Sequence, residues 1–475
     1  MSEIRTYGGW RVSRNLGLGP LDAKQTAVAV VGVLLPLAAF AFGQMLIALL
    51  LAGLGAIAAV LVIATKGGVS LWDSGVAWLR WQIADQQGHT AYRAAHLAPI
   101  PRTWDLPGVL ASATLLEAEV PGRGRAGVIW HRRTGVLAAT VLLSPAGALL
   151  ADRRTVDARV AAWGQLLAAL GDDPNIVSLC LSVDLSPDPG TRLADHVNAR
   201  IDPNAPELAR RVLGQIVQAA PYASADVSTR LTIAQRPTRT RGANLSDAVA
   251  DVLRTLDALP VAAAGAEVLR TATPGDLTGI LRRAFDPASA SAPRAAFDRL
   301  EWAESGPVTA DDLPSCYQHD SYFSQTFVLQ AAPRQVVTHD VLLPLLSPGR
   351  HPRRIALHYR TLTTAEAGAV LERENNAAAA REEMRRRSRR DPTHREIEDA
   401  TRAGRAAREE AQGAGLVQFT LGVTITASSQ DELADARAEL LKAAGRSRLK
   451  LRCAHYAQAA AFASTLPVGL HPQLL

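Results

Sequence analysis

Two short motifs in this chain contain residue types that do chemistry in other proteins. Residues 122–127 match the GxGxxG pattern, which binds a dinucleotide where it leaves a strand and opens a helix. The residues after Gly127 are strand-like here, so the pattern predicts a hairpin turn instead. His319, Asp320 and Ser321 are the three residue types of a catalytic triad. Triads are assembled in space from distant positions, so we expect these three to lie in a polar loop.

Other catalytic and metal-binding patterns are missing from the sequence. No GxxxxGK[ST] motif occurs, so the chain lacks the phosphate loop and lysine of a P-loop ATPase. Its 11 His show no HxxxH or HExxH spacing, and Cys180, Cys316 and Cys453 form no CxxC pair. An odd number of distant cysteines also indicates a reducing compartment. We therefore expect no catalytic residues, no cofactor, no metal and no enzymatic activity.

Positive charge is concentrated in one stretch. The net charge is +6 over 475 residues, which is not typical of nucleic-acid-binding proteins. On a helix, such a run forms a solvated face with i,i+4 ion pairs, docks onto an acidic protein, or contacts anionic lipid or nucleic acid. No aromatic residue interrupts it, which disfavours stacking on single strands, so nucleic acid is possible but not favoured. The run contains Arg381, Arg385, Arg386, Arg387, Arg389 and Arg390.

Near the N-terminus lies a long segment without charge. Residues 25–65 contain no Asp, Glu, Lys or Arg, and they divide into apolar runs at 26–43 and 45–65. Each run is long enough to cross a bilayer as a helix. The segment is too long and begins too late for a cleaved signal peptide. Basic residues flank both ends, so we expect a two-span hairpin in the inner (cytoplasmic) membrane, with both termini and the main body cytoplasmic.

Small residues and tryptophans accompany this hairpin. A small-residue ridge on the second run could pack against the first run or against a partner's helix; it consists of Ala48, Ala52, Ala56 and Ala59. An amphipathic helix follows, and its indole rings would favour the headgroup layer, although the helix could instead cover the cytoplasmic domain. Its tryptophans are Trp72, Trp78 and Trp81.

The remaining chain alternates between short strands and Ala-rich helices, which is typical of an α+β fold. We expect βαβ or ferredoxin-like units with mixed sheets, preceded by the transmembrane hairpin. Strands are expected at 112–119, 126–131, 136–143, 175–183, 227–235, 322–330, 354–362, 417–425 and 447–453. Helices are expected at 155–170, 206–219, 246–259, 338–346 and 431–445.

These elements suggest six regions. They are a cytoplasmic segment at 1–24, the hairpin at 25–65, the amphipathic helix and connector at 66–103, a first α+β domain at 104–285, a linker-like segment at 286–320, and a second α+β domain at 321–475 with a charged helical insertion at 363–412.

The last third of the chain resembles a known family. A strand with Phe327 and Leu329 is followed by Pro333, the helix at 342–346, the strand at 354–362, the charged insertion and the strand LVQFTLGVTITA. This order is similar to the N-terminal, non-catalytic domain of the large conjugation ATPases of type IV secretion systems. The hairpin resembles the small two-span subunit often fused to them. The whole most resembles an actinobacterial family of membrane proteins encoded near such ATPases.

The resemblance implies a function and a contact region. In those ATPases the closing segment leads into the nucleotide-binding domain, whereas this chain ends at Leu475. It therefore implies an oligomeric, membrane-tethered platform for a separately encoded P-loop ATPase. The alternative is a membrane-tethered DNA-handling accessory factor that uses the Arg-rich run 381–390. The end expected to face the ATPase contains Gln458, Phe462, Leu466, Pro467 and Gly469.

Overall fold

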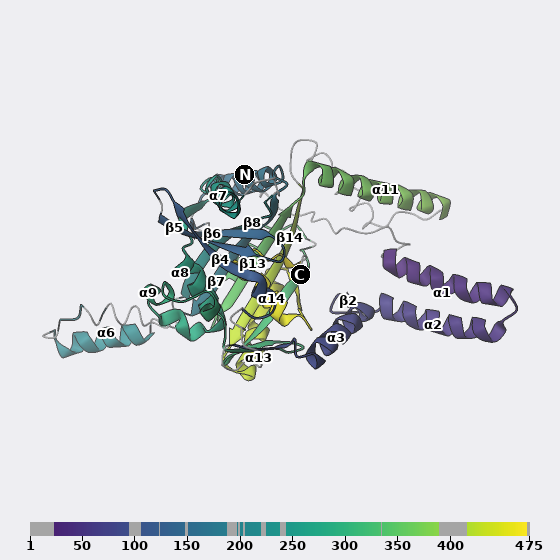
Figure 1. Ribbon diagram of the computed structural model, residues 1–475, viewed down its shortest axis with the longest axis horizontal. Coiled ribbons are helices and arrows are strands. Elements are labelled where there is room, and N and C mark those ends of the chain that lie inside the picture. Colours follow the sequence, from purple (N-terminus) through teal and green to yellow (C-terminus); the bar gives the residue numbers. More distant parts are fainter. Residues whose placement is uncertain are drawn as a thin grey trace.

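A computed structural model describes most of the chain. The described residues are 23–94, 106–122, 124–147, 151–187, 197, 200–202, 205–219, 225–237, 244–333, 335–388 and 416–472. Their fold is α+β, as expected, and it is dominated by one large antiparallel sheet (Figure 1).

The sheet contains thirteen strands, and eleven of them follow one continuous path. Their order is β3-β10-β11-β12-β14-β13-β7-β8-β6-β5-β4, with β9 beside β6 and β15 beside β12. Every strand pair in the described residues is antiparallel, so the expectation of mixed sheets was wrong. The reason is that β12 lies between β14 and β15. The helical crossover from β14 to β15 therefore joins strands that run parallel without pairing.

The strand order is equivalent when it is followed from either end of the sheet, so the body consists of two equivalent halves. Apart from β3, the path from one end is β10-β11-β12-β14-β13, and from the other it is β4-β5-β6-β8-β7. In each half the final strand, β15 or β9, pairs with the third. The halves meet where β7 pairs with β13, about a centre at Ser182 and Ala356. An approximate two-fold axis therefore passes through this seam.

The first half begins with a three-stranded meander, after which the chain leaves the sheet through helices and returns each time as a strand. Its strands are β4 (Ala113–Val120), β5 (Gly124–His131), β6 (Val136–Pro145), β7 (Ile176–Pro187), β8 (Ala225–Gln235) and β9 (Ala266–Thr271). Its helices are α4 (Arg153–Leu170), α6 (Glu207–Ala219), α7 (Leu245–Asp257) and α8 (Pro274–Phe285), after the short η2 (Gly108–Ser112).

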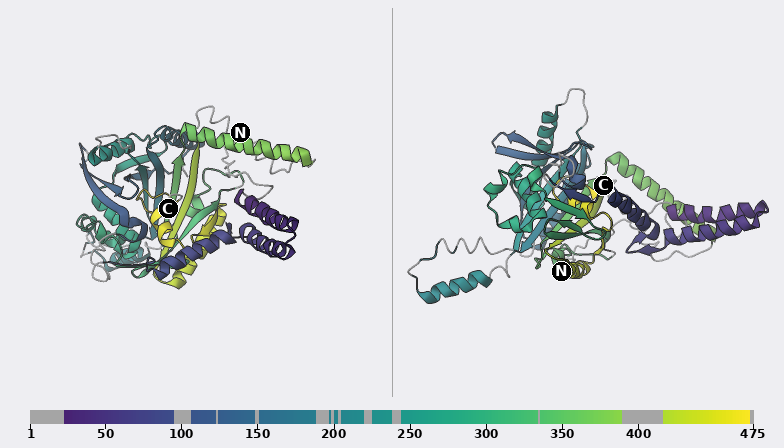
Figure 2. Two further views of the ribbon diagram at one scale, coloured as in Figure 1. Left: turned by 45° about the vertical axis from the view of Figure 1, so that its right-hand side comes forward. Right: turned by 60° about the horizontal axis from the view of Figure 1, so that its bottom comes forward.

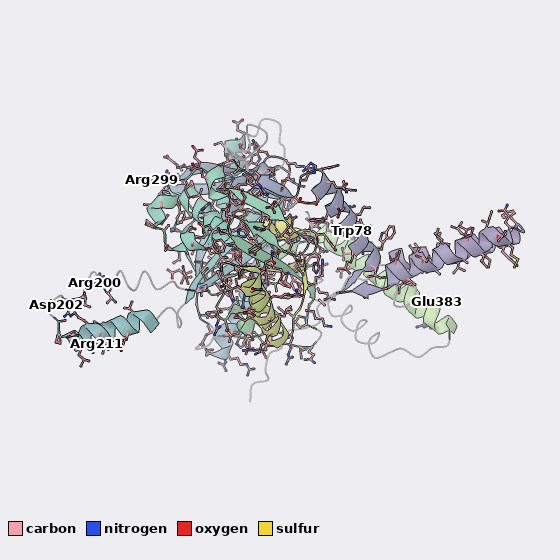
Figure 3. All side chains as sticks on the ribbon, turned by 90° about the horizontal axis from the view of Figure 1, so that it is seen from below. Trp78, Arg200, Asp202, Arg211, Arg299 and Glu383 are labelled. Atoms are coloured by element: carbon pink, nitrogen blue, oxygen red, sulfur yellow. The ribbon has the colours of Figure 1, made fainter. Side chains whose placement is uncertain are left out.

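The second half repeats this order. Its strands are β10 (Thr309–Asp312), β11 (Tyr317–His319), β12 (Tyr322–Ala331), β13 (Arg353–Thr361), β14 (Val417–Ala427) and β15 (Lys450–Cys453). Its helices are α10 (Leu343–Leu346), α11 (Thr364–Ser388), α13 (Gln430–Arg446) and α14 (Gln458–Ser464). Because α6 and α11 both follow the seam strands, which run antiparallel, they leave the body on opposite sides (Figure 3).

Local sequence accounts for several of these elements. Strand β14 alternates apolar and polar residues, so its two sides face different environments. Helix α13 begins after its N-cap Ser429, whose hydroxyl accepts a hydrogen bond from the Glu432 N–H. The sequence Ser-Gln-Asp-Glu at 429–432 is typical of such a capping signal. Thr273 and Asp276 form a full capping box before α8, which the strand and helix expectations had missed.

Helices cover one face of the sheet, and the last part of the chain covers the other. On the first face, α4 and α7 pack on β8 through Leu166, Leu256 and Ile233. There α10 and α13 pack on the second half, with Leu440 and Val423 in the core. On the second face lie α8, α14 and residues 465–471, here named the C-terminal segment. Their side chains share a core with the sheet that includes Ile129, Ala138, Leu277, Phe285, Phe462, Leu466 and Val468.

The division into two domains with a linker is not what the structure has. Residues 286–320 fold as η4 (Pro287–Ser291), α9 (Arg294–Phe297), η5 (Ala303–Ser305), β10 and β11. Phe297 is buried against Gly279 of α8, and β10 and β11 belong to the sheet. The Ala, Ser and Pro content that suggested a linker is overridden by this packing. The helix expected at 338–346 is reduced to the short α10.

An apolar helical hairpin precedes the body. It consists of α1 (Ala23–Ala41) and α2 (Met45–Ile63), and it projects from the body on the same side as α11 (Figure 2). In the described residues α2 is the one helix long and apolar enough to cross a membrane, and the apolar part of α1, Gln25–Ala41, is shorter. The hairpin leads through β1 (Thr65–Lys66) and β2 (Val69–Ser70) into α3 (Leu71–Gln86) and β3 (Ala91–Arg93).

Candidate functional site

The body contains a cleft that is lined by arginines. Its volume is about 510 Å³, and its lining includes residues of α8 and α9 and of the seam strands β7 and β13. Strands β7, β8, β13 and β14 form its floor. The charged residues of the lining are three aspartates and six arginines: Asp184, Asp226, Asp276, Arg230, Arg270, Arg283, Arg294, Arg353 and Arg354.

At the floor, one carboxylate pairs with two arginines. Asp184 on β7 accepts a hydrogen bond from Arg230 of β8, and its Oδ1 lies 2.7 Å from Nε of Arg354 on β13. Burial alone would raise the pKa of Asp184, but the charges of Arg354 and Arg230 outweigh burial and lower it to about 2. The carboxylate is therefore ionised throughout the physiological range. Because Arg354 belongs to the other half, this cluster also ties the two halves together.

A second carboxylate organises the wall. Asp276 in the first turn of α8 is paired with Arg270, and Arg294 Nη2 lies 3.4 Å from its Oδ2. Burial raises the pKa of Asp276, but hydrogen bonds from Arg270 and Thr273 reverse this effect and lower it. Nearby, the Arg283 guanidinium lies 5.3 Å from the centre of the Phe297 ring. The wall therefore presents cationic groups that are already held in place.

Part of the hydrogen-bonding capacity at the cleft is unused. The Arg230 side chain is 5% exposed, and its Nε has no hydrogen-bond partner among the described residues. The same holds for Nε of Arg353. Leaving a buried donor unpaired costs about 1–3 kcal/mol. Arg353 also pairs with Glu439, which lies outside the cleft, at 3.2 Å. The lining nevertheless has an excess of arginine over aspartate and two buried Nε donors without an acceptor, so its chemistry suits an anionic group.

Residues expected to face an ATPase are instead inside the body. Gln458, Phe462, Leu466 and Pro467 are buried, and Gly469 is half-buried. Gln458 bonds the backbone N–H and carbonyl of Thr326. In this conformation these residues form core rather than a contact surface, because the C-terminal segment packs across the sheet.

The C-terminal segment connects both halves. His131 Nε2 lies 2.6 Å from the Val468 carbonyl oxygen, and Thr140 donates a 3.4 Å hydrogen bond to the Pro467 carbonyl. A side chain on Gly469 would collide with Ala138, and Gly469 has φ +76°, so glycine is required there on two grounds.

The three tryptophans of α3 have different environments. Trp81 Nε1 donates a 2.9 Å hydrogen bond to the Asp312 carbonyl, which fastens α3 to the body. Trp72 and Trp78 are exposed, together with Leu79. One face of α3 therefore covers the body, and the other presents apolar side chains next to the hairpin. The contact of Trp81 agrees with a helix that covers the body, and the position of the helix in a headgroup layer stays a prediction.

The alanine ridge of α2 is only partly covered. Ala48 is buried and Ala59 is half-buried, whereas Ala52 and Ala56 are exposed. The tightest approach of the two helices is instead made by glycines: a Cβ on Gly55 would lie 2.8 Å from the Gly32 carbonyl oxygen. Each apolar run contains two glycines, so the sequence alone did not indicate which pair would make this contact.

The Arg-rich run lies at the end of α11. Arg386 and the nearby Glu383 are exposed on this helix, which stands away from the body (Figure 3). Arg381, Arg385 and Arg387 lie on the same helix, but their side chains, like Arg389 and Arg390 altogether, lie outside the described residues.

The two motifs with catalytic residue types are structural. Gly122 and Gly124 have φ of +75° and +81° in the turn between β4 and β5, which confirms the hairpin turn. His319 is not in a polar loop but is fully buried in β11, where its Nδ1 lies 2.7 Å from the Phe285 carbonyl oxygen. Burial lowers its pKa to about 4. No group of three or more His, Cys, Asp or Glu in the described residues could hold a metal ion.

Sequence reasoning did not find the cleft. Its arginines come from β8, β9, α8, α9 and β13, and they are separated by up to 124 positions, from Arg230 to Arg354. No spacing pattern connects such residues. The only available signal was the capping box at Thr273, which marks the start of α8.

The fold and the site define a class of protein: an α+β body of two equivalent halves, joined to an apolar hairpin and carrying a cationic cleft. No family model matches the chain, and no curated protein matches it. The function of the chain is therefore inferred from the geometry of its body, cleft and hairpin, and from the resemblance of its sequence to the conjugation ATPases.

Proposed function

We propose that this chain is a non-enzymatic, membrane-anchored structural component of a conjugation or type IV-like secretion apparatus. It acts as an assembly platform for a separately encoded P-loop ATPase and assembles with copies of itself. Both hairpin helices span the inner membrane, with both termini and the body in the cytoplasm. Each half of the body is a ferredoxin-like unit, because its four core strands, such as β6, β7, β8 and β9, have the order β9-β6-β8-β7.

One observation carries the proposal: the molecule has two apolar surfaces at opposite ends. The hairpin projects from one end, and α6 projects from the other (Figures 1 and 3). Helix α6 is amphipathic, and its apolar stripe is exposed, with Leu208 at 70%, Val212 at 45% and Ile216 at 57%. An exposed apolar stripe on a helix that projects from the body suits a protein partner. Its position opposite the hairpin suits a partner on the cytoplasmic side.

The membrane assignment is supported by the neighbourhood of the hairpin. Leu46, Leu49 and Leu50 of α2 are exposed, as lipid-facing residues are. The exposed Trp72 and Trp78 of α3 follow directly in the chain, at the height where indole rings favour headgroups. A second span through α1 is needed if both ends of the hairpin are to lie in the cytoplasm.

The test is affinity purification of the tagged chain from a detergent extract of membranes. We expect a protein with Walker motifs to co-purify, identified by mass spectrometry. In the variant Leu208→Glu with Ile216→Glu, the recovered ATPase should fall at least tenfold, because two buried charges would oppose docking. Deleting the C-terminal residues would not discriminate, since the buried C-terminal segment is part of the core.

A matched control is available on the same helix. Gly214 is exposed on the side of α6 opposite Val212, and no atom lies within 4 Å of the position its Cβ would take, so Gly214→Glu should leave recovery of the ATPase unchanged. Purification of the chain alone, without an ATPase, would contradict the proposal. Equal loss in the control and the stripe variant would show that α6 is not the docking helix.

The alternative function is DNA handling by the Arg-rich run. The observation that favours it is that α11 stands away from the body with Arg386 exposed. It predicts DNA binding that weakens steeply with salt and weakens further when the arginines at 385–390 become Gln. Absence of salt-dependent binding would rule it out.

A further inference from the structure

The approximate two-fold axis of the sheet makes the cleft comparable with a groove in the other half. Thr140 pairs with Thr232 across β6 and β8, and Thr326 pairs with Thr424 across β12 and β14, with hydroxyl oxygens 2.9 and 2.8 Å apart. These pairs make Thr140 equivalent to Thr326 and Thr232 equivalent to Thr424. The strand register on both sides of the seam extends this equivalence to the neighbouring strands. Asp184 is then equivalent to His358, Arg230 to Gly422, and Thr426 to Ala234.

In one half, the groove at these positions is filled by the chain itself. The His471 ring lies 5.5 Å from the His358 ring. A Cβ on Gly422 would lie 3.0 Å from Thr465, and a Cβ on Gly469 would lie 3.4 Å from that of Ala234. The non-helical C-terminal segment therefore occupies this groove along much of its length, from residue 465 to residue 471.

In the other half, the equivalent positions line the open cleft. Asp184, Arg230 and Thr426 all belong to its lining. The cleft therefore has the place in the fold that a short non-helical segment occupies on the other side of the axis. Among the described residues, no segment takes that place.

The cleft residues at positions equivalent to the lining of the filled groove determine which kind of ligand the cleft would bind. Where the filled groove has Gly422 and His358, the cleft has Arg230 and Asp184, and Arg270, Arg283 and Arg294 stand above them. The unpaired Nε of Arg230 adds a buried donor without an acceptor. Carboxylates are the natural partners for such arginines.

Nucleic acid suits this lining less well. Three aspartates in the lining would repel a phosphate backbone, and its one aromatic ring, Phe297, is already covered by Arg283. A peptide avoids both problems, because its backbone is neutral and its acidic side chains can be placed only where the arginines are.

We propose that the arginine-lined cleft binds a short, non-helical acidic peptide segment of another protein chain. The filled groove suggests a length of about seven residues. This site differs from the apolar stripe of α6 and depends neither on the hairpin nor on an ATPase, so it extends the proposed function without resting on it.

The test is fluorescence anisotropy with the full chain in detergent and a labelled heptapeptide, Asp-Ser-Asp-Val-Asp-Ser-Asp. We expect saturable binding that weakens with salt, because the contacts are ionic. A peptide with Asn in place of each Asp should bind at least tenfold more weakly. In the variant Arg283→Gln with Arg294→Gln, the affinity for the acidic peptide should also fall at least tenfold.

The control variants distinguish binding in the cleft from nonspecific ionic attraction between the peptide and the protein surface. Arg299 is exposed near α9 but does not line the cleft, so Arg299→Gln should change affinity less than twofold (Figure 3). The single variant Arg294→Gln changes a side chain that is 52% exposed, so it keeps the fold and should still weaken binding about threefold. The proposal is overturned if the Asn peptide binds equally well, if neither cleft variant weakens binding, or if a seven-nucleotide oligothymidine binds the cleft more tightly than the peptide.

Discussion

At the scale of single residues, the floor of the cleft is held by one carboxylate between two arginines from different strands. Asp184 is 19% exposed, and Arg230 and Arg354 are 5% and 11% exposed. Two cations that are so well buried depend on their counter-ion, because an unpaired buried charge is strongly destabilising. The seam between the halves is therefore sensitive to this position.

Replacing Asp184 by Asn should lower the free energy of unfolding by about 3–5 kcal/mol, since it leaves both arginines without a charge partner. The measurement is urea unfolding of the purified chain in detergent, followed by fluorescence. Asp226 also lines the cleft but is exposed, so Asp226→Asn should change stability by no more than about 0.5 kcal/mol. Equal effects of the two variants would contradict this role of Asp184.

Buried histidines should make the body unstable in acid. Burial lowers the pKa of His319 and His471 to about 4, and of His358 to about 3. The folded state thus binds fewer protons than the unfolded state between about pH 4 and 6.5, so the free energy of unfolding falls as the pH falls through this window. Asp312 acts in the opposite direction, because burial raises its pKa to about 6.

The three histidines together outweigh this single carboxyl group, so we expect the urea midpoint to fall steadily from pH 6.5 to 4.5. In Asp312→Asn the opposing contribution is absent, and the midpoint should depend on pH more steeply. A midpoint that is constant over this range, or that rises in acid, would show that these histidines are accessible to protons in the folded state.

At the scale of elements, the hairpin depends on the contact between Gly32 and Gly55. Substituting Leu for Gly55 would push the helices apart, because the new Cβ would lie 2.8 Å from a backbone oxygen. Close packing is the main attraction between helices in lipid, so the variant should lower the thermal midpoint of the hairpin in detergent and the amount of chain recovered from membranes. Gly53 has no atom within 4 Å of its Cβ position, so Gly53→Leu should behave as the unchanged chain does.

Element types were predictable from the sequence where the local pattern is strong. The alternation in β14 and the capping signal at Ser429 predicted β14 and α13 close to their final bounds. Strands β9, β10 and β11 were missed because they are short, with 6, 4 and 3 residues, and because β9 pairs with β6 and β10 pairs with β3, both distant in the chain. The region at 286–320 looked like a linker because its fold depends on Phe297 reaching Gly279, a tertiary contact that no local pattern encodes.

At the scale of the whole molecule, the pairing of two equivalent halves explains both the filled groove and the open cleft. This symmetry could not be predicted, because the halves share little at equivalent positions beyond the threonine pairs Thr140–Thr232 and Thr326–Thr424. The cleft follows from the symmetry, and so it was also beyond sequence reasoning. The hairpin and the α6 stripe, in contrast, are visible in the sequence as apolar runs and spacing.

The same arrangement separates two tasks at opposite ends of the body. The apolar hairpin leaves from one end, and the exposed stripe of α6 lies at the other. If the chain is a platform, the membrane association of its ATPase must depend on both ends. Loss of either the hairpin or the stripe should then release the ATPase into the cytosol.

The most direct measurement is therefore the fraction of the co-purifying P-loop ATPase that sediments with membranes in cells that contain the chain, lack it, or carry Leu208→Glu with Ile216→Glu. The account predicts a mostly membrane-bound ATPase in the first case and a mostly cytosolic one in the other two, with Gly214→Glu resembling the unchanged chain. An ATPase that stays on the membrane in cells without the chain would contradict the account.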